Sequence, residues 1–115
     1  MVTQQEERRQ RKEFSLDRIR ELAAAGKVDY WSRDVSKDIE NLSYSPDDVH
    51  ACLASLAENH YRESVNYGDR KGWLDVYHIT YQSPTGHQDE LYIKLKLNRD
   101  CVTILLMSFH REGSL

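Results

Sequence analysis

The chain has 115 residues, of which 39% are hydrophobic and 30% are charged, and its net charge is −3. This length predicts one domain with a core of its own. The acidic balance counts against a strongly basic nucleic-acid-binding protein but leaves room for a local basic patch. Because we find neither an apolar run long enough to span a bilayer nor the apolar segment of a signal peptide, we expect a cytoplasmic protein outside the membrane.

Residues 1–13 lack apolar periodicity and predict a flexible polar tail ahead of a single domain over residues 14–115. The tail carries a basic cluster that could contact a nucleic acid or an acidic partner: Arg8, Arg9, Arg11 and Lys12. Three nearby glutamates almost cancel this charge, which favours a solvated tail. Further along, Cys52 and Cys101 lie in apolar segments and predict buried, reduced thiols rather than a disulfide.

The N-terminal half predicts three helices, each begun by a serine whose hydroxyl can accept from free N–H groups of the first turn. These N-cap candidates are Ser15, Ser32 and Ser45. Gly26 predicts the end of the first helix, and residues 27–31 after it fit a short strand. The third helix has Pro46 in its first turn and is expected to end near Glu58 or Asn59.

From residue 61 onward the hydrophobic pattern changes to period 2, which predicts strands. We expect these strands at residues 61–67, 73–81, 91–97 and 101–110. Helices followed by consecutive strands predict an α+β fold, with an antiparallel sheet of about four to five strands packed by the N-terminal helices.

Residues 91–97 alternate most strictly. Their leucines and Ile93 point to one face, while Tyr92, Lys94 and Lys96 point to the other. We therefore expect this strand to be central or near-central, with its apolar face buried against the first and third helices.

The opposite face could carry chemistry, because other ionisable side chains lie on neighbouring segments. His110 ends the next strand, His78 lies on the strand at 73–81, and Arg62 follows the third helix. Cleavage of RNA without a metal needs a base for the ribose 2′-hydroxyl, a cation for the phosphoryl oxygens and an acid for the leaving oxygen. We find no phosphate loop, zinc spacing or Ser-His-Asp motif, and we expect neither metal nor cofactor. On periodicity alone, a solvated strand face is the better interpretation.

A resemblance to the MqsR family changes this weighting. It rests on four segments in a fixed order: Y-R-E-S-V-N-Y-G-D from Tyr61, W-L-D-V-Y from Trp73, L-Y-I-K-L from Leu91 and I-L-L-M-S-F from Ile104. The resemblance covers roughly residues 14–112. The family comprises toxins of bacterial toxin–antitoxin systems, so the resemblance implies a RelE-like fold, cleavage of mRNA and a cognate antitoxin.

The resemblance also implies site residues by position. The catalytic candidates are His110, Tyr92, Arg62 and Lys94, and we add Lys96, His78 and Arg111 as substrate-binding candidates. Arg62 and His110 stand where lysine is usual in the family, and Leu74 replaces the glutamine of its W-Q-D-V-Y motif. We expect His110 and Tyr92 to act on opposite sides of one phosphate, with His110 transferring the proton because imidazole titrates nearest neutral pH.

Three functions remain open at this point. The leading hypothesis is a metal-independent endoribonuclease toxin that acts on mRNA, is restrained by an antitoxin, and is a monomer or small oligomer when free. The second is a non-catalytic relative that binds a protein or RNA, which Leu74 and the negative net charge favour. The third is an immunity-like or regulatory protein whose acidic surface neutralises a basic partner.

Overall fold

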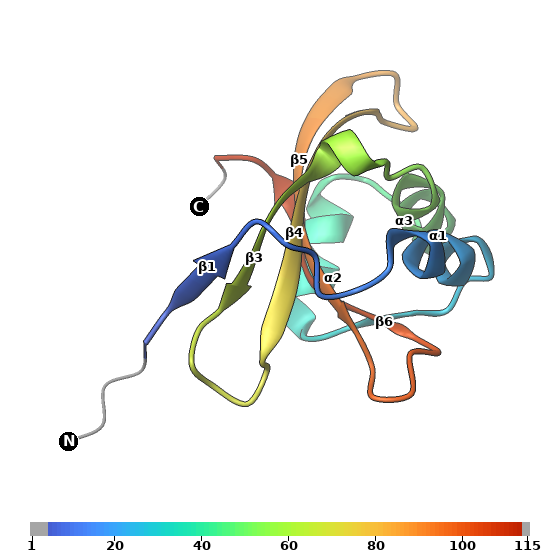
Figure 1. Cartoon of the computed structure of the whole chain (residues 1–115). Helices are drawn as coiled ribbons and strands as arrows, with labels where there is room; N and C mark the ends of the chain where they lie inside the picture. Colours follow the sequence, from blue (N-terminus) through green and yellow to red (C-terminus); the bar gives the residue numbers. More distant parts are fainter. Residues whose placement is uncertain (1–4, 114–115) are drawn as a thin grey trace.

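The computed structural model describes residues 5–113, and its helices and strands form an α+β fold. In chain order the elements are β1 (Glu7–Arg9), α1 (Leu16–Ala24), β2 (Val28–Tyr30), α2 (Arg33–Asn41), α3 (Pro46–Ala54), the 3-10 helix η1 (Glu58–His60), β3 (Tyr61–Asn66), β4 (Trp73–Gln82), β5 (Gln88–Leu97) and β6 (Ile104–Arg111). The predicted fold class is therefore confirmed. Figure 1 shows α1 and α3 side by side, with β1 at the opposite side of the molecule.

The sheet has six strands in the order β1-β3-β4-β5-β6-β2. Neighbouring strands are antiparallel except β2 and β6, which are parallel. The predicted count of four to five strands is slightly low because β1, an edge strand of three residues, shows no apolar period, whereas the short strand predicted at residues 27–31 is present as β2. As predicted, β5 lies inside the sheet, between β4 and β6.

Two of the three predicted N-cap serines accept a hydrogen bond from the first turn of their helix through their side chains. Ser15 Oγ accepts from the Arg18 N–H at 3.2 Å, and Ser45 forms a reciprocal capping box with Asp48. Ser32 occupies the N-cap position of α2 without a side-chain hydrogen bond. Gly26 follows α1 with a φ of 70°, the left-handed conformation that glycine adopts readily at the end of a helix.

The third helix ends at Ala54, four residues before the predicted limit. Ser55 is its C-cap residue, and the Ser55 hydroxyl donates to the Cys52 carbonyl of the last turn at 2.6 Å. Glu58 and Asn59 belong instead to η1, in which the Ala57 N–H donates to His60 Nδ1 at 2.9 Å.

The main core lies between the helices and one face of the sheet. Along β5, the four apolar side chains of this face are no more than 5% exposed; they are Leu91, Ile93, Leu95 and Leu97. They belong to one cluster with buried residues of all three helices, such as Ile19 of α1 and Val49 of α3. The predicted burial of this strand face is confirmed, and the helices leave the other face of the sheet uncovered.

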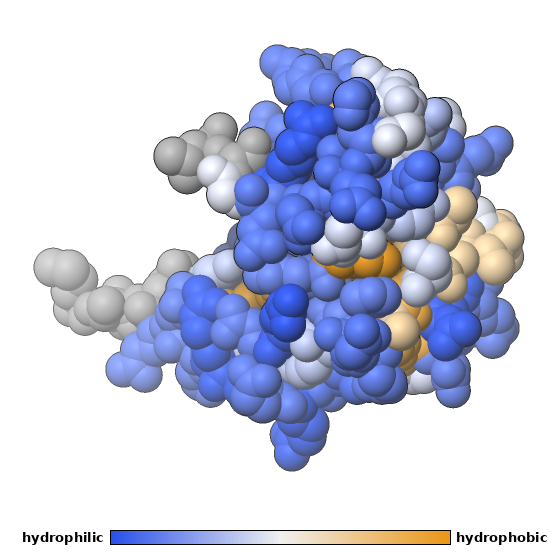
Figure 2. Space-filling model, turned by 90° about the horizontal axis from the view of Figure 1, so that it is seen from above, coloured by the Kyte–Doolittle hydropathy of each residue, from blue (hydrophilic) through white to orange (hydrophobic). Residues whose placement is uncertain are grey.

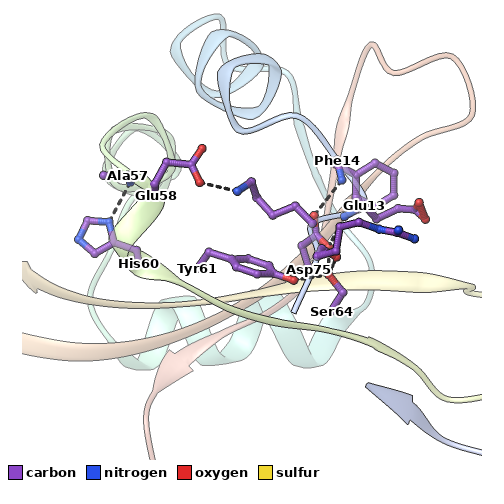
Figure 3. Close-up of polar contacts among 10 residues, drawn as sticks. Glu13, Phe14, Ala57, Glu58, His60, Tyr61, Ser64 and Asp75 are labelled. Atoms are coloured by element: carbon purple, nitrogen blue, oxygen red, sulfur yellow. Dashed lines mark hydrogen bonds and ion pairs between the residues drawn. The ribbon is translucent and has the colours of Figure 1, made fainter. Parts of the chain in front are cut away.

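Asp75 fixes the segment before α1 to the sheet. Its carboxylate is fully buried and accepts from the backbone N–H groups of Glu13 (3.0 Å) and Phe14 (2.9 Å) and from the Ser64 hydroxyl (2.6 Å) (Figure 3). Burial raises the pKa of Asp75, and these hydrogen bonds oppose the shift. The aspartate of the W-x-D-V-Y motif therefore has a structural role.

Part of the segment predicted as a flexible tail forms a strand. Glu7–Arg9 forms β1, which pairs with β3, and residues 1–4 lie outside the described residues. The sequence gives no sign of β1 because its pairing is determined by the free edge of β3 rather than by apolar side chains of its own.

The two cysteines differ in environment. Cys52 is buried, and burial raises the pKa of its thiol to about 12. Cys101 is exposed, so the prediction that it is buried is wrong. It lies in the turn before β6 with a φ of 55°, because the strand begins at Ile104 and not at residue 101 as predicted. Asn98 Oδ1 organises this turn by accepting from two backbone N–H groups.

The surface is mostly hydrophilic, and in the view from above hydrophobic residues are visible only in limited patches (Figure 2). Within residues 5–113, none of the helices has the length and apolarity needed to cross a membrane.

Candidate active site on the open face of the sheet

The sheet face opposite the helices, which we call the open face, has a small apolar floor. Val65, Leu74 and Val76 are buried there, and Tyr67, Tyr92 and Met107 pack against them. Leu74 therefore contributes apolar support to the open face. We call these three buried residues the apolar floor.

Three aromatic side chains form a row across the middle of the open face. Tyr92 of β5 lies directly opposite His78 of β4 on one side and His110 of β6 on the other. The centre of the phenol ring is 5.3 Å from that of the His78 ring and 5.2 Å from that of the His110 ring. The Tyr92 and His110 rings are nearly parallel, at 11°. We call these three residues the aromatic row. The structure thus brings together Tyr92 and His110, which were predicted to be catalytic, and His78, which was predicted to bind substrate.

The contacts of the two histidines leave ring nitrogens for a substrate. His110 Nδ1 lies 2.8 Å from the Arg111 carbonyl oxygen. Because a carbonyl can only accept, Nδ1 must carry the proton and Nε2 keeps its lone pair in the neutral ring. His78 Nδ1 lies 3.2 Å from a carboxylate oxygen of Glu112, which forms an ion pair with the ring when it is protonated. In both cases Nε2 remains for a further partner.

Lys94 supplies positive charge beside the row. Its Nζ donates to the Tyr67 hydroxyl at 2.7 Å and lies 5.8 Å from the centre of the Tyr92 ring. Burial raises the pKa of the Tyr92 phenol above its ordinary value of 10, and the Lys94 ammonium opposes this shift. Tyr92 therefore stays protonated at neutral pH and can donate a hydrogen bond.

Lys96 lies on the same face as Lys94, one alternation along β5. Its Nζ donates to the Lys71 carbonyl at 3.0 Å and lies 5.5 Å from the centre of the Trp31 ring. A cavity of about 340 Å³ opens beside it, with Trp73, Lys71 and Arg99 also in its lining. A cationic and aromatic cavity of this kind suits a nucleic-acid base, because bases stack on aromatic rings and phosphates attract ammonium groups.

Two predicted site residues are not joined to the aromatic row. Arg62 is exposed at a β-bulge of β3; within residues 5–113 its side chain makes no hydrogen bond or ion pair. Its charge contributes, after burial, to lowering the pKa of His60. Arg111 lies opposite Leu91, and its Nε donates to the buried Asp89 carboxylate at 3.1 Å. Arg111 therefore faces the helix side of the sheet.

Sequence reasoning missed the residues that support the row. Tyr67 contacts Lys94, and Glu112 contacts His78. The partners of each pair lie far apart in the chain, and no local sequence pattern predicts either contact. A partial signal existed for Tyr67, because an aromatic residue just before Gly68 ends a strand at a turn, where it can reach across the sheet.

No group of three or more His, Cys, Asp or Glu side chains suited to holding a metal ion occurs in the described part of the chain. The aromatic row and Lys94 bring two imidazoles, a phenol and an ammonium group to one part of the surface. These groups can transfer protons and bind a phosphate.

The fold and the family comparison together define the class of this protein. Residues 11–111 match a family model described as "Motility quorum-sensing regulator, toxin of MqsA". No curated protein matches the sequence. The class is that of toxins of toxin–antitoxin systems. Within this class, the chain belongs to the MqsR toxin family, as the resemblance of its sequence motifs indicated.

Proposed function

We propose that this toxin is a metal-independent endoribonuclease that cleaves mRNA on the open face of the sheet and thereby inhibits translation and growth. The observation that carries the proposal is the aromatic row. It places two imidazoles on either side of a protonated phenol, with Lys94 next to them. Imidazole is the side chain best suited to proton transfer near neutral pH, and an ammonium group suits an anionic transition state.

In the proposed reaction, His110 Nε2 accepts the proton of a ribose 2′-hydroxyl. The 2′-oxygen then bonds to the adjacent phosphorus, and the bond from phosphorus to the 5′-oxygen of the next nucleotide breaks. The leaving 5′-oxygen takes a proton from His78, whose protonated ring is paired with Glu112. The products are a 2′,3′-cyclic phosphate and a free 5′-hydroxyl, so one proton is taken up and one is given.

The remaining groups bind and orient the RNA. Tyr92 lies between the two histidines and donates a hydrogen bond to the ribose or to a phosphoryl oxygen. Lys94 stabilises the charge that develops on the phosphoryl oxygens. Arg62, whose guanidinium has no competing partner within residues 5–113, binds a phosphate from the β3 side, and Lys96 with its neighbouring cavity holds a base.

The family also supports a regulatory partner. Its description names a toxin of MqsA, and a toxin of this class is held inactive by an antitoxin, so we expect a cognate antitoxin for this chain as well. Both mRNA and the ribosome are cytoplasmic, and we place the protein there. Expression of the chain alone should arrest growth of a sensitive host, and co-expression of the antitoxin should restore growth and co-purify.

The test is single-turnover cleavage of a short labelled RNA. His110→Ala should reduce the rate roughly 10²–10⁴-fold, whereas His87→Ala, which removes an exposed histidine in the turn between β4 and β5, should leave it unchanged. Circular dichroism checks that each variant is folded. Full activity in a folded His110→Ala/Tyr92→Phe double variant would refute this site, and loss of activity with EDTA would replace the mechanism by a metal-dependent one.

A second candidate function is a non-catalytic RNA-binding module. The apolar floor favours it, since Leu74 at 1% exposure offers no polar group to a substrate. The same assay separates the two functions, because a binding module would retain labelled RNA in a gel-shift experiment and leave it intact.

A further inference from the structure

Strand β1 adds a feature that the family match does not cover. The match begins at residue 11, whereas β1 spans Glu7–Arg9 and forms one edge of the sheet. Its register sets the direction of its side chains, because directly opposed residues of neighbouring strands share a face. Arg8 is opposite Val65, which belongs to the apolar floor, so Arg8 lies on the open face.

The neighbouring arginine confirms this alternation. Arg9 is opposite Ser64, whose hydroxyl donates to Asp75 on the helix side of the sheet. The Arg9 guanidinium stacks over the Trp73 ring at 4.0 Å. The basic cluster of the N-terminal segment is therefore divided, and Arg8 alone among the residues of β1 brings a positive charge to the open face.

Arg8 ends close to the candidate active site. Its guanidinium forms an ion pair with Glu63 of β3 and a second one, at 3.0 Å, with Glu6. Glu63 is opposite Val76, which in turn is opposite Lys94. With strands about 4.8 Å apart, Glu63 and Lys94 are roughly 10 Å apart along one row. Both charges of the pair influence the Tyr92 phenol: Arg8 lowers its pKa and Glu63 raises it. Their effects are smaller than those of burial and of Lys94.

We propose that Arg8 binds a backbone phosphate of the RNA next to the scissile one, and that Glu63 occupies the guanidinium until the RNA arrives. This inference rests on the proposed function. A guanidinium binds carboxylate and phosphate through the same pair of N–H groups, so one can replace the other. The exchange costs little, because an exposed ion pair contributes less than about 1 kcal/mol.

The position of Arg8 decides what it affects. Arg8 on β1 lies three strands away from Lys94 on β5, and its charge lowers the pKa of the Tyr92 phenol only as a minor contribution. It therefore acts on a neighbouring phosphate and contributes to binding of the ground state and the transition state alike. Such uniform binding changes KM or Kd and leaves the rate at saturating RNA unaltered.

The competing explanation is that Arg8 and Glu63 only tie β1 to β3. A double-mutant cycle separates the two roles. Binding is measured with a 2′-O-methyl RNA oligonucleotide, which lacks the attacking hydroxyl, for the wild type, Arg8→Gln, Glu63→Gln and the double variant. Arg20→Gln, which removes an exposed charge from helix α1 on the other side of the sheet, is the matched control.

We expect Arg8→Gln to weaken binding about five- to twentyfold at low salt, to lower the salt slope of log K by about 0.7, and to leave single-turnover cleavage at saturating RNA within about twofold. Glu63→Gln should tighten binding, with most of this gain lost in the Arg8→Gln background. The control Arg20→Gln should change neither quantity.

Each contrary result is informative. The Arg8 proposal is overturned if Arg8→Gln behaves like Arg20→Gln, if the gain from Glu63→Gln is the same in both backgrounds, or if both single variants weaken binding and lower the melting temperature, as a structural tie would. If the wild type binds RNA with an Arg8-dependent salt slope but does not cleave unmodified RNA, the proposed cleavage fails and the role of Arg8 stands.

Discussion

Replacing Leu95 by alanine tests the burial of the central strand on which the site is built. Leu95 is fully buried on the helix side of β5, opposite Asp75 in β4 and Leu106 in β6. The change removes three buried carbon groups at about 0.8 kcal/mol each, or about 2.4 kcal/mol in total. The cavity left behind adds to this cost, and the expected loss of unfolding free energy is about 2.5–5 kcal/mol.

The assay is unfolding in urea and by heat, followed by far-UV circular dichroism. In a domain of this size 1 kcal/mol shifts the melting temperature by about 4 °C, so we expect a decrease of about 10–20 °C. The control is Val102→Ala, which removes a side chain that is 47% exposed and should cost less than about 0.5 kcal/mol. A Leu95→Ala protein that melts with the wild type would refute the packing of β5 against the helices.

Three further predictions concern titratable groups. Iodoacetamide at pH 8 should label one thiol per folded chain, at the exposed Cys101, while the buried Cys52 with its pKa near 12 should react only in denaturant; labelling of both thiols in the folded protein would contradict the burial of Cys52. Because burial raises the pKa of Cys52 from 9.0 in its ordinary state, its contribution to stability is present below about pH 9 and is lost as the pH rises toward 12. The difference in unfolding free energy between the wild type and Cys52→Ala should shrink across that range, and a constant difference would argue against the shift. Because the pKa of Tyr92 is raised above 10, the ratio of cleavage rates of the wild type and Tyr92→Phe should stay constant from pH 6 to about 9; a tenfold rise per pH unit would instead show that the phenolate is the base.

The features predicted correctly from the sequence are those that local chemistry determines. Ser45 begins α3 because its hydroxyl and the Asp48 carboxylate satisfy each other's backbone N–H groups within four residues. The strict alternation of β5 decides which face is buried, whatever its neighbours are. One error lies where a distant partner decides, because β1 forms only where β3 offers a free edge. The other is local, because the turn that Asn98 organises extends past Cys101 and leaves it exposed.

The same distinction applies to the candidate site. The pattern of β5 is enough to place Tyr92 and Lys94 on one face. The direct opposition of His78 and His110 to Tyr92 depends on the exact register of two hairpins, which a shift of one residue would destroy. The register also directs Arg111, predicted as a substrate-binding residue, to the buried Asp89 on the helix side.

The parallel pairing of β2 with β6 has a consequence for how the chain folds. Val28 pairs with Ile104 and Tyr30 with Leu106, so the edge of the sheet joins segments from opposite ends of the domain. Contacts so distant in sequence slow folding, because the loop between them must close before they stabilise anything. Until β6 has emerged from the ribosome, β2 has no partner, Leu95 has no neighbour on that side, and His110 is absent. Completion of the sheet and assembly of the proposed site therefore coincide, and we expect a chain that ends before β6 to lack the proposed activity.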